Sequence, residues 1–116
     1  MAHMTGTTDR ELKKGSAELL VLTLVETRAR HGYEIGKQID ERSGGALHYN
    51  IASLYPLLYR MEKRGWTRGA WETTSGGVKR RCYSLTAAGL KQLAASRREW
   101  SVFFRALDQL GGLSRA

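Results

Sequence analysis

The stretch that decides the fold is residues 50–66, NIASLYPLLYRMEKRGW. Its apolar residues recur every three or four positions, which predicts one face of an α-helix: Ile51, Leu54, Leu58 and Met61. Pro56 is tolerated best in the first turn, where backbone N–H groups have no partner inside the helix. We therefore expect the regular helix to start late, with Asn50 or Ser53 as its N-cap, and to end at Gly65.

The opposite face of this predicted helix carries hydroxyl groups and cations, at Ser53, Tyr59, Arg60 and Lys63. Such a face is typical of an ordinary helix that is exposed to solvent. It is also what a helix that binds an anionic partner presents. The rest of the chain decides between these two interpretations.

The chain is basic, and its positive charge is concentrated. It has 116 residues, a formal net charge of +8, 41% hydrophobic residues and 26% charged residues, which is typical of one small globular domain. Residues 60–81 contain seven Lys or Arg against Glu62 and Glu72, so this segment alone has a net charge of +5. A basic cluster of this kind indicates an anionic partner. Nucleic acid is the commonest, and an anionic membrane surface is the alternative.

Several classes of protein are not supported by the sequence. The single cysteine, Cys82, excludes an internal disulfide and is typical of a cytoplasmic protein. No apolar run approaches the roughly 18 residues that a membrane span needs. We see no catalytic triad, paired carboxylates, phosphate-binding glycine loop or clustered metal ligands, so we expect no enzyme activity, no cofactor and no metal.

Cys82 allows two interpretations. Arg80 and Arg81 precede it on a predicted strand, and cations lower the pKa of a thiol, which would suit a redox sensor. A small buried side chain with no chemical role is the other interpretation.

The rest of the pattern predicts a mainly α fold with a small β-hairpin. Helices are expected at residues 11–29, 33–42 and 87–110, and strands at 66–74 and 79–85, joined by a tip that contains SGG. Residues 1–10, which open with an apparent expression scar (MAHM), are expected to be disordered, and residues 111–116 to form a flexible tail.

The last predicted helix has the spacing of a packing seam. Its large residues alternate in steps of four and three, with Phe103 beside them: Leu93, Arg97, Trp100, Phe104 and Leu107. Three earlier helices already supply a core, so we interpret this helix as a dimerisation helix with an interface at Leu93, Trp100, Phe104 and Leu107. The alternative is that it folds back on its own domain.

The order of helix, helix, helix, hairpin and helix is that of a winged helix-turn-helix followed by a dimerisation helix. We assign the first part to residues 11–86 and the second to 87–110. In a winged helix-turn-helix, the third helix lies in the DNA major groove and the hairpin contacts the backbone. This arrangement gives the hydroxyl groups and cations on the helix at 50–64 a reason to face outward.

Three segments resemble the PadR-like transcriptional regulators: HGYEIGKQI at 31–39, SLYPLLYRMEKRGW at 53–66 and KRRCYSLTAAG at 79–89. The resemblance covers residues 11–110 and matches the short form of the family, with one C-terminal helix. It implies a homodimeric, winged helix-turn-helix repressor that binds a palindromic operator in double-stranded DNA. The hairpin tip, SGGVK, departs from the Gly-Arg-Pro type of tip that members often have.

The DNA-binding residues are expected on the third helix and on the second strand of the hairpin: Asn50, Ser53, Tyr55, Tyr59, Arg60, Lys63, Lys79, Arg80 and Arg81. Tyr55 flanks the buried stripe, so it either packs or contacts DNA. Strand alternation sends Arg80 and Arg81 to opposite faces. The basic triplet at 79–81 also fits a solvated strand edge that resists aggregation.

The resemblance also implies a small aromatic or drug-like effector at the dimer centre. The residues expected to bind it are Arg97, Trp100, Phe103 and Phe104. The alternative is that Trp100 packs the interface closed. Two other functions remain open at this point: a basic dimerisation module that acts through a protein or membrane-surface partner, and a redox-sensing regulator based on Cys82.

Overall fold

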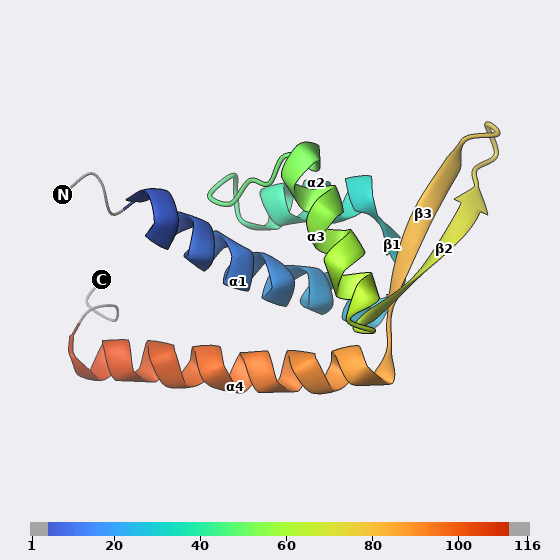
Figure 1. Cartoon of the computed structure of the whole chain (residues 1–116). Coiled ribbons are helices and arrows are strands. Elements are labelled where there is room, and N and C mark those ends of the chain that lie inside the picture. The colour runs from blue at the N-terminus through green and yellow to red at the C-terminus, as the bar shows by residue number, and fades with distance from the viewer. Residues whose placement is uncertain (1–4, 112–116) are drawn as a thin grey trace.

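The computed structural model describes the backbone of residues 5–111 and the side chains of residues 15–111. The elements follow one another along the chain as α1 (Thr5–Thr27), β1 (Arg30–His31), α2 (Gly32–Arg42), α3 (Ile51–Lys63), β2 (Thr67–Thr73), β3 (Lys79–Leu85) and α4 (Ala87–Gln109). In Figure 1, α1, α2 and α3 form one cluster, the β2–β3 hairpin projects from it, and α4 runs beside α1. This is the mainly α, winged helix-turn-helix fold with a long terminal helix that the sequence predicts.

A polar side chain caps each of the three helices that follow β1. His31 accepts a hydrogen bond from the backbone N–H of Glu34 at the start of α2. Asn50 does the same for Ser53 at the start of α3, and the hydroxyl of Thr86 accepts from Gly89 at the start of α4. Because caps satisfy N–H groups that have no partner within the helix, they fix where each helix begins.

The position of Pro56 differs from the expectation. Asn50 is the cap, so Pro56 is the sixth residue of α3 and lies beyond the first turn. Its missing N–H leaves the carbonyl of Ala52 without its helical donor. Both residues are exposed, so water is able to hydrogen-bond that carbonyl, and α3 continues through the proline to Lys63.

Helix α1 also starts earlier than expected, at Thr5 rather than near residue 11. Once a helix has formed, each added residue gains a hydrogen bond at little further cost, so α1 extends into residues 5–10. Residues 1–4 and 112–116, which include the apparent scar and most of the expected tail, lie outside the described residues.

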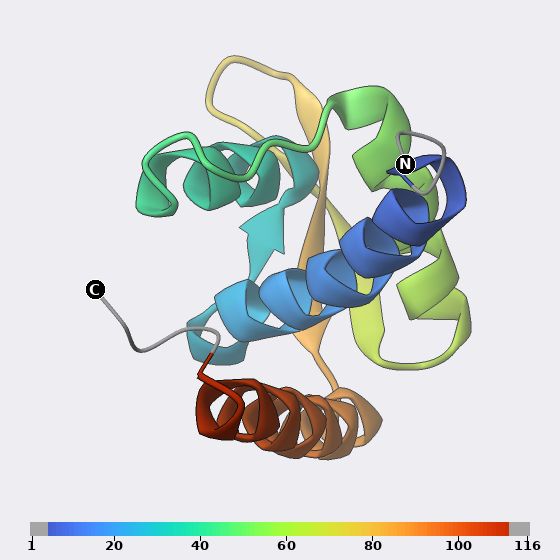
Figure 2. The same cartoon turned by 90° about the vertical axis from the view of Figure 1, so that its left-hand side faces the viewer.

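The sheet has three strands in the order β1-β3-β2, and both pairs are antiparallel. The hairpin has Trp71 opposite Arg81 and Glu72 opposite Arg80. Strand β1 is an addition to the predicted hairpin, and it places His31 opposite Cys82. In Figure 2, the three strands pass behind α1, and α2 and α3 lie on either side of them.

The core draws on every helix and on β3. Its fully buried members include Val21, Leu22, Ile35, Leu54, Leu58, Met61 and Leu93. Gly89 allows α4 to approach the junction between α3 and β2. A Cβ at this position would lie 2.7 Å from Cδ1 of Leu85 and would overlap the carbonyl oxygen of Trp66. The glycine therefore sets the distance between the terminal helix and the helix that carries the predicted DNA-binding residues.

Candidate nucleic-acid interface

Helix α3 has one buried face and one exposed face. The buried residues are Leu54, Leu57, Leu58 and Met61. Ile51, which the periodicity places on the buried stripe, is largely exposed because it is the first residue of the helix, and Leu57 is buried instead. The predicted outward residues are all exposed: Ser53, Tyr59, Arg60 and Lys63.

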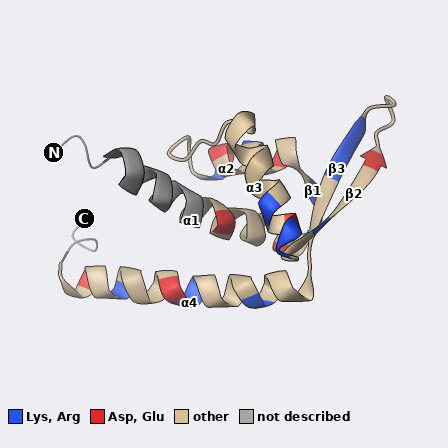
Figure 3. Ribbon diagram, in the orientation of Figure 1, with Lys and Arg blue, Asp and Glu red and all other residues tan. Residues whose placement is uncertain are grey.

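The exposed face of α3 is basic and partly ordered by an aromatic contact. The Lys63 ammonium lies 5.5 Å from the centre of the Tyr59 ring, within the range of a cation–π interaction. Within residues 15–111, neither Arg60 nor Lys63 forms an ion pair with a carboxylate. Figure 3 shows Lys and Arg on the C-terminal part of α3 and along β3. This face is therefore free to meet an anionic partner.

Two of the predicted DNA-binding residues also have structural roles. The Asn50 side chain is used in capping α3. The Tyr55 ring packs on the first residue of α2, since a Cβ on Gly32 would lie 2.5 Å from Cε1 of Tyr55. Tyr55 nevertheless remains 42% exposed, so the ring combines a packing role with access to solvent.

Arg81 fastens the hairpin to α3. Its Nη2 donates to Oε2 of Glu62 over 2.5 Å, and its Nε lies 3.4 Å from Oε1. Its guanidinium also lies 5.4 Å from the centre of the Trp71 ring. The hydrogen bond to Glu62 raises the pKa of Arg81. Arg81 was expected to bind DNA together with Lys79 and Arg80. In the structure its guanidinium is paired with Glu62, and this pair holds the hairpin against α3.

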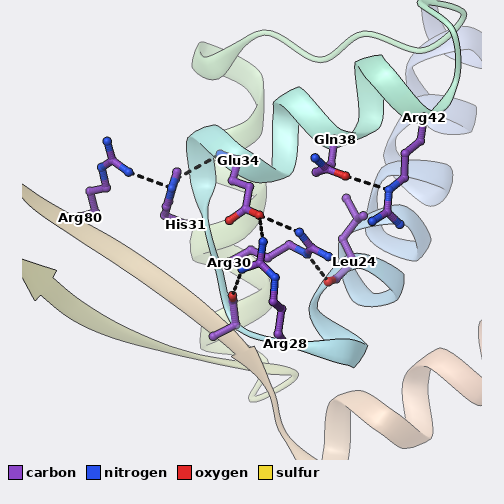
Figure 4. Close-up of polar contacts among 9 residues, drawn as sticks. Leu24, Arg28, Arg30, His31, Glu34, Gln38, Arg42 and Arg80 are labelled. Atoms are coloured by element: carbon purple, nitrogen blue, oxygen red, sulfur yellow. Dashed lines mark hydrogen bonds and ion pairs between the residues drawn. The ribbon is translucent and has the colours of Figure 1, made fainter. Parts of the chain in front are cut away.

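Arg80 points to the other side of the strand, as the alternation predicts. Its Nη1 lies 3.0 Å from Nε2 of His31, the residue that caps α2 (Figure 4). Lys79 is also exposed. Among residues 15–111, neither Lys79 nor Arg80 has an ion-pair partner, although Glu72 is directly opposite Arg80 in the hairpin.

A cleft of about 330 Å³ opens between the start of α2, α3 and the hairpin. It is lined by four aromatic residues, three cations, His31 and Gly32; the aromatic residues are Tyr33, Tyr55, Trp71 and Tyr83, and the cations are Lys79, Arg80 and Arg81. Two of these residues were not among the predicted DNA-binding residues: Tyr33, which is 60% exposed, and Trp71, which is 66% exposed. The sequence signal that could have pointed to Trp71 was a large aromatic residue on a predicted strand within the basic segment 60–81.

An ion-pair cluster beneath this cleft fixes the start of α2. Arg30 is 6% exposed, and it donates from Nε to the carbonyl of Leu24 and from Nη1 to Glu34, over 2.7 Å in each case. Arg28 also pairs with Glu34 (Figure 4). Burial works to raise the pKa of Glu34, but the hydrogen bonds from Arg28 and Arg30 lower it overall. The cluster thus ties α1, β1 and α2 together around His31.

Cys82 does not have the environment of a reactive thiolate. It is buried on β3, and burial, followed by the nearby Glu72 carboxylate, raises the pKa of its thiol. These effects outweigh the charge of Arg80, which was expected to lower that pKa. The structure therefore favours a buried small residue over a redox sensor.

The predicted seam on α4 is divided between the chain's own core and an exposed surface. Leu93 is fully buried within its own domain, so its assignment to a dimer interface is wrong. Arg97 donates to Glu26 of α1 over 2.8 Å, and this hydrogen bond lowers the pKa of Glu26. The first half of the stripe therefore packs on α1, which agrees with the alternative interpretation that this helix folds back on its own domain.

The second half of the stripe stays open. Phe103 and Phe104 are 51% and 49% exposed, and their rings lie 6.0 and 5.7 Å from that of Trp100. Trp100 is half-buried, and its Cζ2 would lie 4.0 Å from a Cβ on Gly15. In Figures 1 and 2, α1 rises away from α4 toward its N-terminus, which agrees with the exposure of Phe103 and Phe104.

Two further features bear on other classes of partner. Within the described residues, no helix is long and apolar enough to cross a membrane. Within the same residues, no three His, Cys, Asp or Glu side chains come together as metal ligands.

Comparison with known proteins places this geometry in a family. The model of the transcriptional regulator PadR-like family matches residues 21–95. An uncharacterised protein of Lysinibacillus sphaericus is 28% identical over 98 residues, which cover 84% of this chain and 90% of that protein.

Solved structures agree with this match. A PadR family transcription regulator from Clostridium difficile R20291 is 28% identical with a TM-score of 0.74, covering 83% of this chain and 98% of that one. A PadR-like transcriptional regulator from Bacillus cereus is also 28% identical with a TM-score of 0.74, covering 86% and 95% of the two chains. With its winged fold, basic α3 and matched sequence, the chain belongs to the PadR-like family of DNA-binding transcriptional regulators.

Proposed function

We propose that this chain is a homodimeric repressor. Helix α3 recognises the bases of a palindromic operator, and the β2–β3 hairpin contacts the DNA backbone. The observation that carries the proposal is the Glu62–Arg81 hydrogen bond, which joins α3 and the hairpin into one unit. This bond neutralises Arg81, while other cations of α3 and the hairpin stay exposed, among them Arg60, Lys63, Lys79 and Arg80. A major-groove helix flanked by a basic hairpin is the contact pattern of winged helix-turn-helix proteins on DNA.

The two parts of this surface have different expected roles. Contacts from side chains to phosphates position a protein on DNA, whereas contacts to base edges provide sequence specificity. Ser53, Tyr59 and Arg60 lie on α3 and are suited to reach base edges. Lys79 and Arg80 lie on the hairpin and are suited to the backbone.

The direct test is a mobility-shift assay with the DNA upstream of the protein's own gene, compared with random DNA. We expect Arg60→Ala to lower the ratio of specific to random binding. Lys79→Ala should weaken binding to both DNAs about equally and reduce the slope of log affinity against log salt by about one. A wild-type protein that binds neither DNA at low salt would contradict the proposed function.

A second copy of the chain is the proposed partner of the open half of α4. Phe103 and Phe104 expose a contiguous aromatic surface, and a twofold-symmetric operator requires a twofold-symmetric protein. Leu107 is half-buried at the edge of this surface. Analytical ultracentrifugation at micromolar concentration should give a dimer. A wild-type monomer would contradict this part of the proposal.

The aromatic cluster of Trp100, Phe103 and Phe104 is the proposed effector site. Flat apolar walls suit a planar aromatic molecule, and a ligand between two terminal helices would change the distance between the two copies of α3. To release DNA, the ligand must bind the DNA-incompetent dimer more tightly than the competent one.

Planar aromatic compounds should therefore quench tryptophan fluorescence, and Trp100→Ala should remove most of the quenching while the protein stays dimeric. Trp66 and Trp71 also emit, so each is substituted in turn as a control. Quenching that survives Trp100→Ala unchanged would mean that Trp100 only packs the interface.

A further inference from the structure

We propose that His31 and Arg80 together hold one phosphate of the DNA backbone, in the cleft between the start of α2 and the hairpin. The proposal rests on the proposed function and adds a residue, His31, that lies outside the basic segments. Its starting point is a pair of contacts that the imidazole makes, one through each ring nitrogen (Figure 4).

The two contacts of His31 have incompatible requirements. Nδ1 lies 3.2 Å from the backbone nitrogen of Glu34, which donates a hydrogen bond to it. Nε2 lies 3.0 Å from Nη1 of Arg80, which is also only a donor. A neutral imidazole has one acceptor nitrogen, and a protonated one has none. In every protonation state, therefore, at least one of these two donors faces an N–H group instead of a lone pair.

The cap decides which contact is satisfied. When Nδ1 accepts from Glu34, as an N-cap must, Nε2 carries the proton and points at the Arg80 guanidinium. Two donors then converge on one point of the cleft, and no carboxylate within residues 15–111 is paired with Arg80. An oxygen anion between them would accept from both and leave the cap intact.

The charge, size and aromatic walls of the cleft suit a phosphate of DNA as that anion. Lys79 also lines the cleft, so the site has excess positive charge, and its volume of about 330 Å³ accommodates a phosphate group. Trp71 and Tyr33 form flat, exposed walls of the same cleft, beside which a sugar-phosphate backbone can lie. Tyr55 of α3 also lines the cleft and is 42% exposed, so under the proposed function DNA that is bound to α3 would bring its backbone close to this point.

The consequence is a coupling between the hairpin and α2. In the free protein, Nη1 of Arg80 lies 3.0 Å from Nε2 of His31, and both present an N–H group when Nδ1 of His31 accepts the cap hydrogen bond. When DNA binds, both side chains turn their N–H groups to one phosphate. His31 is then a DNA-contact residue as well as the cap of α2, and its contribution depends on Arg80.

A double-mutant cycle tests this coupling. His31→Asn keeps a good N-cap but is too short to reach Arg80, and His31→Ala, which also removes the cap, serves as the comparison. Affinity for a short duplex of arbitrary sequence is measured by fluorescence anisotropy for wild type, His31→Asn, Arg80→Ala and the double variant. Arg105→Ala, on the exposed face of α4 and distant from the hairpin, is the control.

His31→Asn should lower the affinity about tenfold, the expected effect of losing one hydrogen bond to a charged group. It should leave the melting temperature near that of wild type, whereas His31→Ala should lower both. In the Arg80→Ala background, the same substitution should cost about threefold or less, because the shared phosphate is no longer held.

Two results would overturn the inference while leaving DNA binding itself in place. One is a folded His31→Asn variant that binds the duplex as tightly as wild type, which would make His31 a cap only. The other is an equal loss of affinity in both backgrounds, which would show that the two residues act independently. A wild-type protein that does not bind the duplex would instead overturn the proposed function together with this inference.

Discussion

Gly89→Ala should destabilise the protein even though alanine is the better helix former. Gly89 is in the first turn of α4, and its backbone lies against the link between α3 and β2. A Cβ there would overlap the Trp66 carbonyl oxygen and would lie 2.9 Å from the Trp66 carbonyl carbon. These are backbone atoms, so they cannot rotate away. The same carbonyl accepts a hydrogen bond from the N–H of Thr86 over 3.1 Å.

Two opposing effects set the size of the change. Overpacking costs about 1–3 kcal/mol, and loss of the hydrogen bond from Thr86 costs about 1 kcal/mol more. Replacing glycine by alanine in a helix stabilises the folded state by at most about 1 kcal/mol. The steric effect therefore wins by about 2 kcal/mol, which for a domain of this size corresponds to a decrease in Tm of about 8–16 °C.

Gly15→Ala is the matched control, because it makes the same change within a helix without a clash. Among the described side chains, the nearest atom to a Cβ at Gly15 is Cζ2 of Trp100 at 4.0 Å, an ordinary van der Waals distance. We expect this variant to be more stable than wild type by up to about 1 kcal/mol. Thermal unfolding followed by circular dichroism, at one fixed protein concentration, compares the three proteins. A Gly89→Ala protein that melts with or above Gly15→Ala would refute the close contact between α4 and Trp66.

Three further predictions separate the roles assigned to other residues. Leu93→Ala should lower the free energy of unfolding by about 2–5 kcal/mol in chemical denaturation, because it leaves a cavity in the core, whereas Phe104→Glu should leave the fold intact and give a monomer in sedimentation. The lowered pKa of Glu34 stabilises the folded state above the unfolded-state pKa, and this contribution is lost as the pH falls through the folded-state value. Glu34→Gln should therefore be less stable than wild type at neutral pH, and the difference should shrink in urea titrations below about pH 4. Because burial raises the pKa of the Cys82 thiol, iodoacetamide should label it slowly at neutral pH, and Cys82→Ala should bind DNA like wild type after peroxide treatment; loss of binding only in the peroxide-treated wild type would restore the redox interpretation.

Local signals predicted most of the fold. The apolar spacing of α3 and the caps at Asn50 and Thr86 involve residues within one turn of each other, so they are visible in the sequence. The hairpin was predicted for the same reason, from two β-rich segments around SGG. Strand β1 was missed because it has only two residues, too few to show any alternation.

Contacts between distant residues were the harder part. Periodicity shows that α4 has an apolar stripe, but not that α1 covers the stripe at Leu93 and leaves it open at Phe104. A count of charges shows a basic segment, but not that Glu62 neutralises Arg81 across 19 positions. In the same way, the sequence shows His31 directly before Gly32, and its position beside Arg80 emerges only when β1 pairs with β3.

The most direct test of the DNA-binding surface compares two double variants that remove the same charge from different places. Arg60→Ala with Lys63→Ala removes two exposed cations from α3, and Arg98→Ala with Arg105→Ala removes two exposed cations from α4. The measurement is the slope of log affinity against log salt for duplex DNA. We expect the α3 variant to have a smaller slope than wild type, by about one for each removed cation that neutralises a phosphate, and the α4 variant to keep the wild-type slope. Equal losses in the two variants would show that DNA responds to net charge alone, and a larger loss in the α4 variant would place the DNA-binding surface on the other side of the molecule.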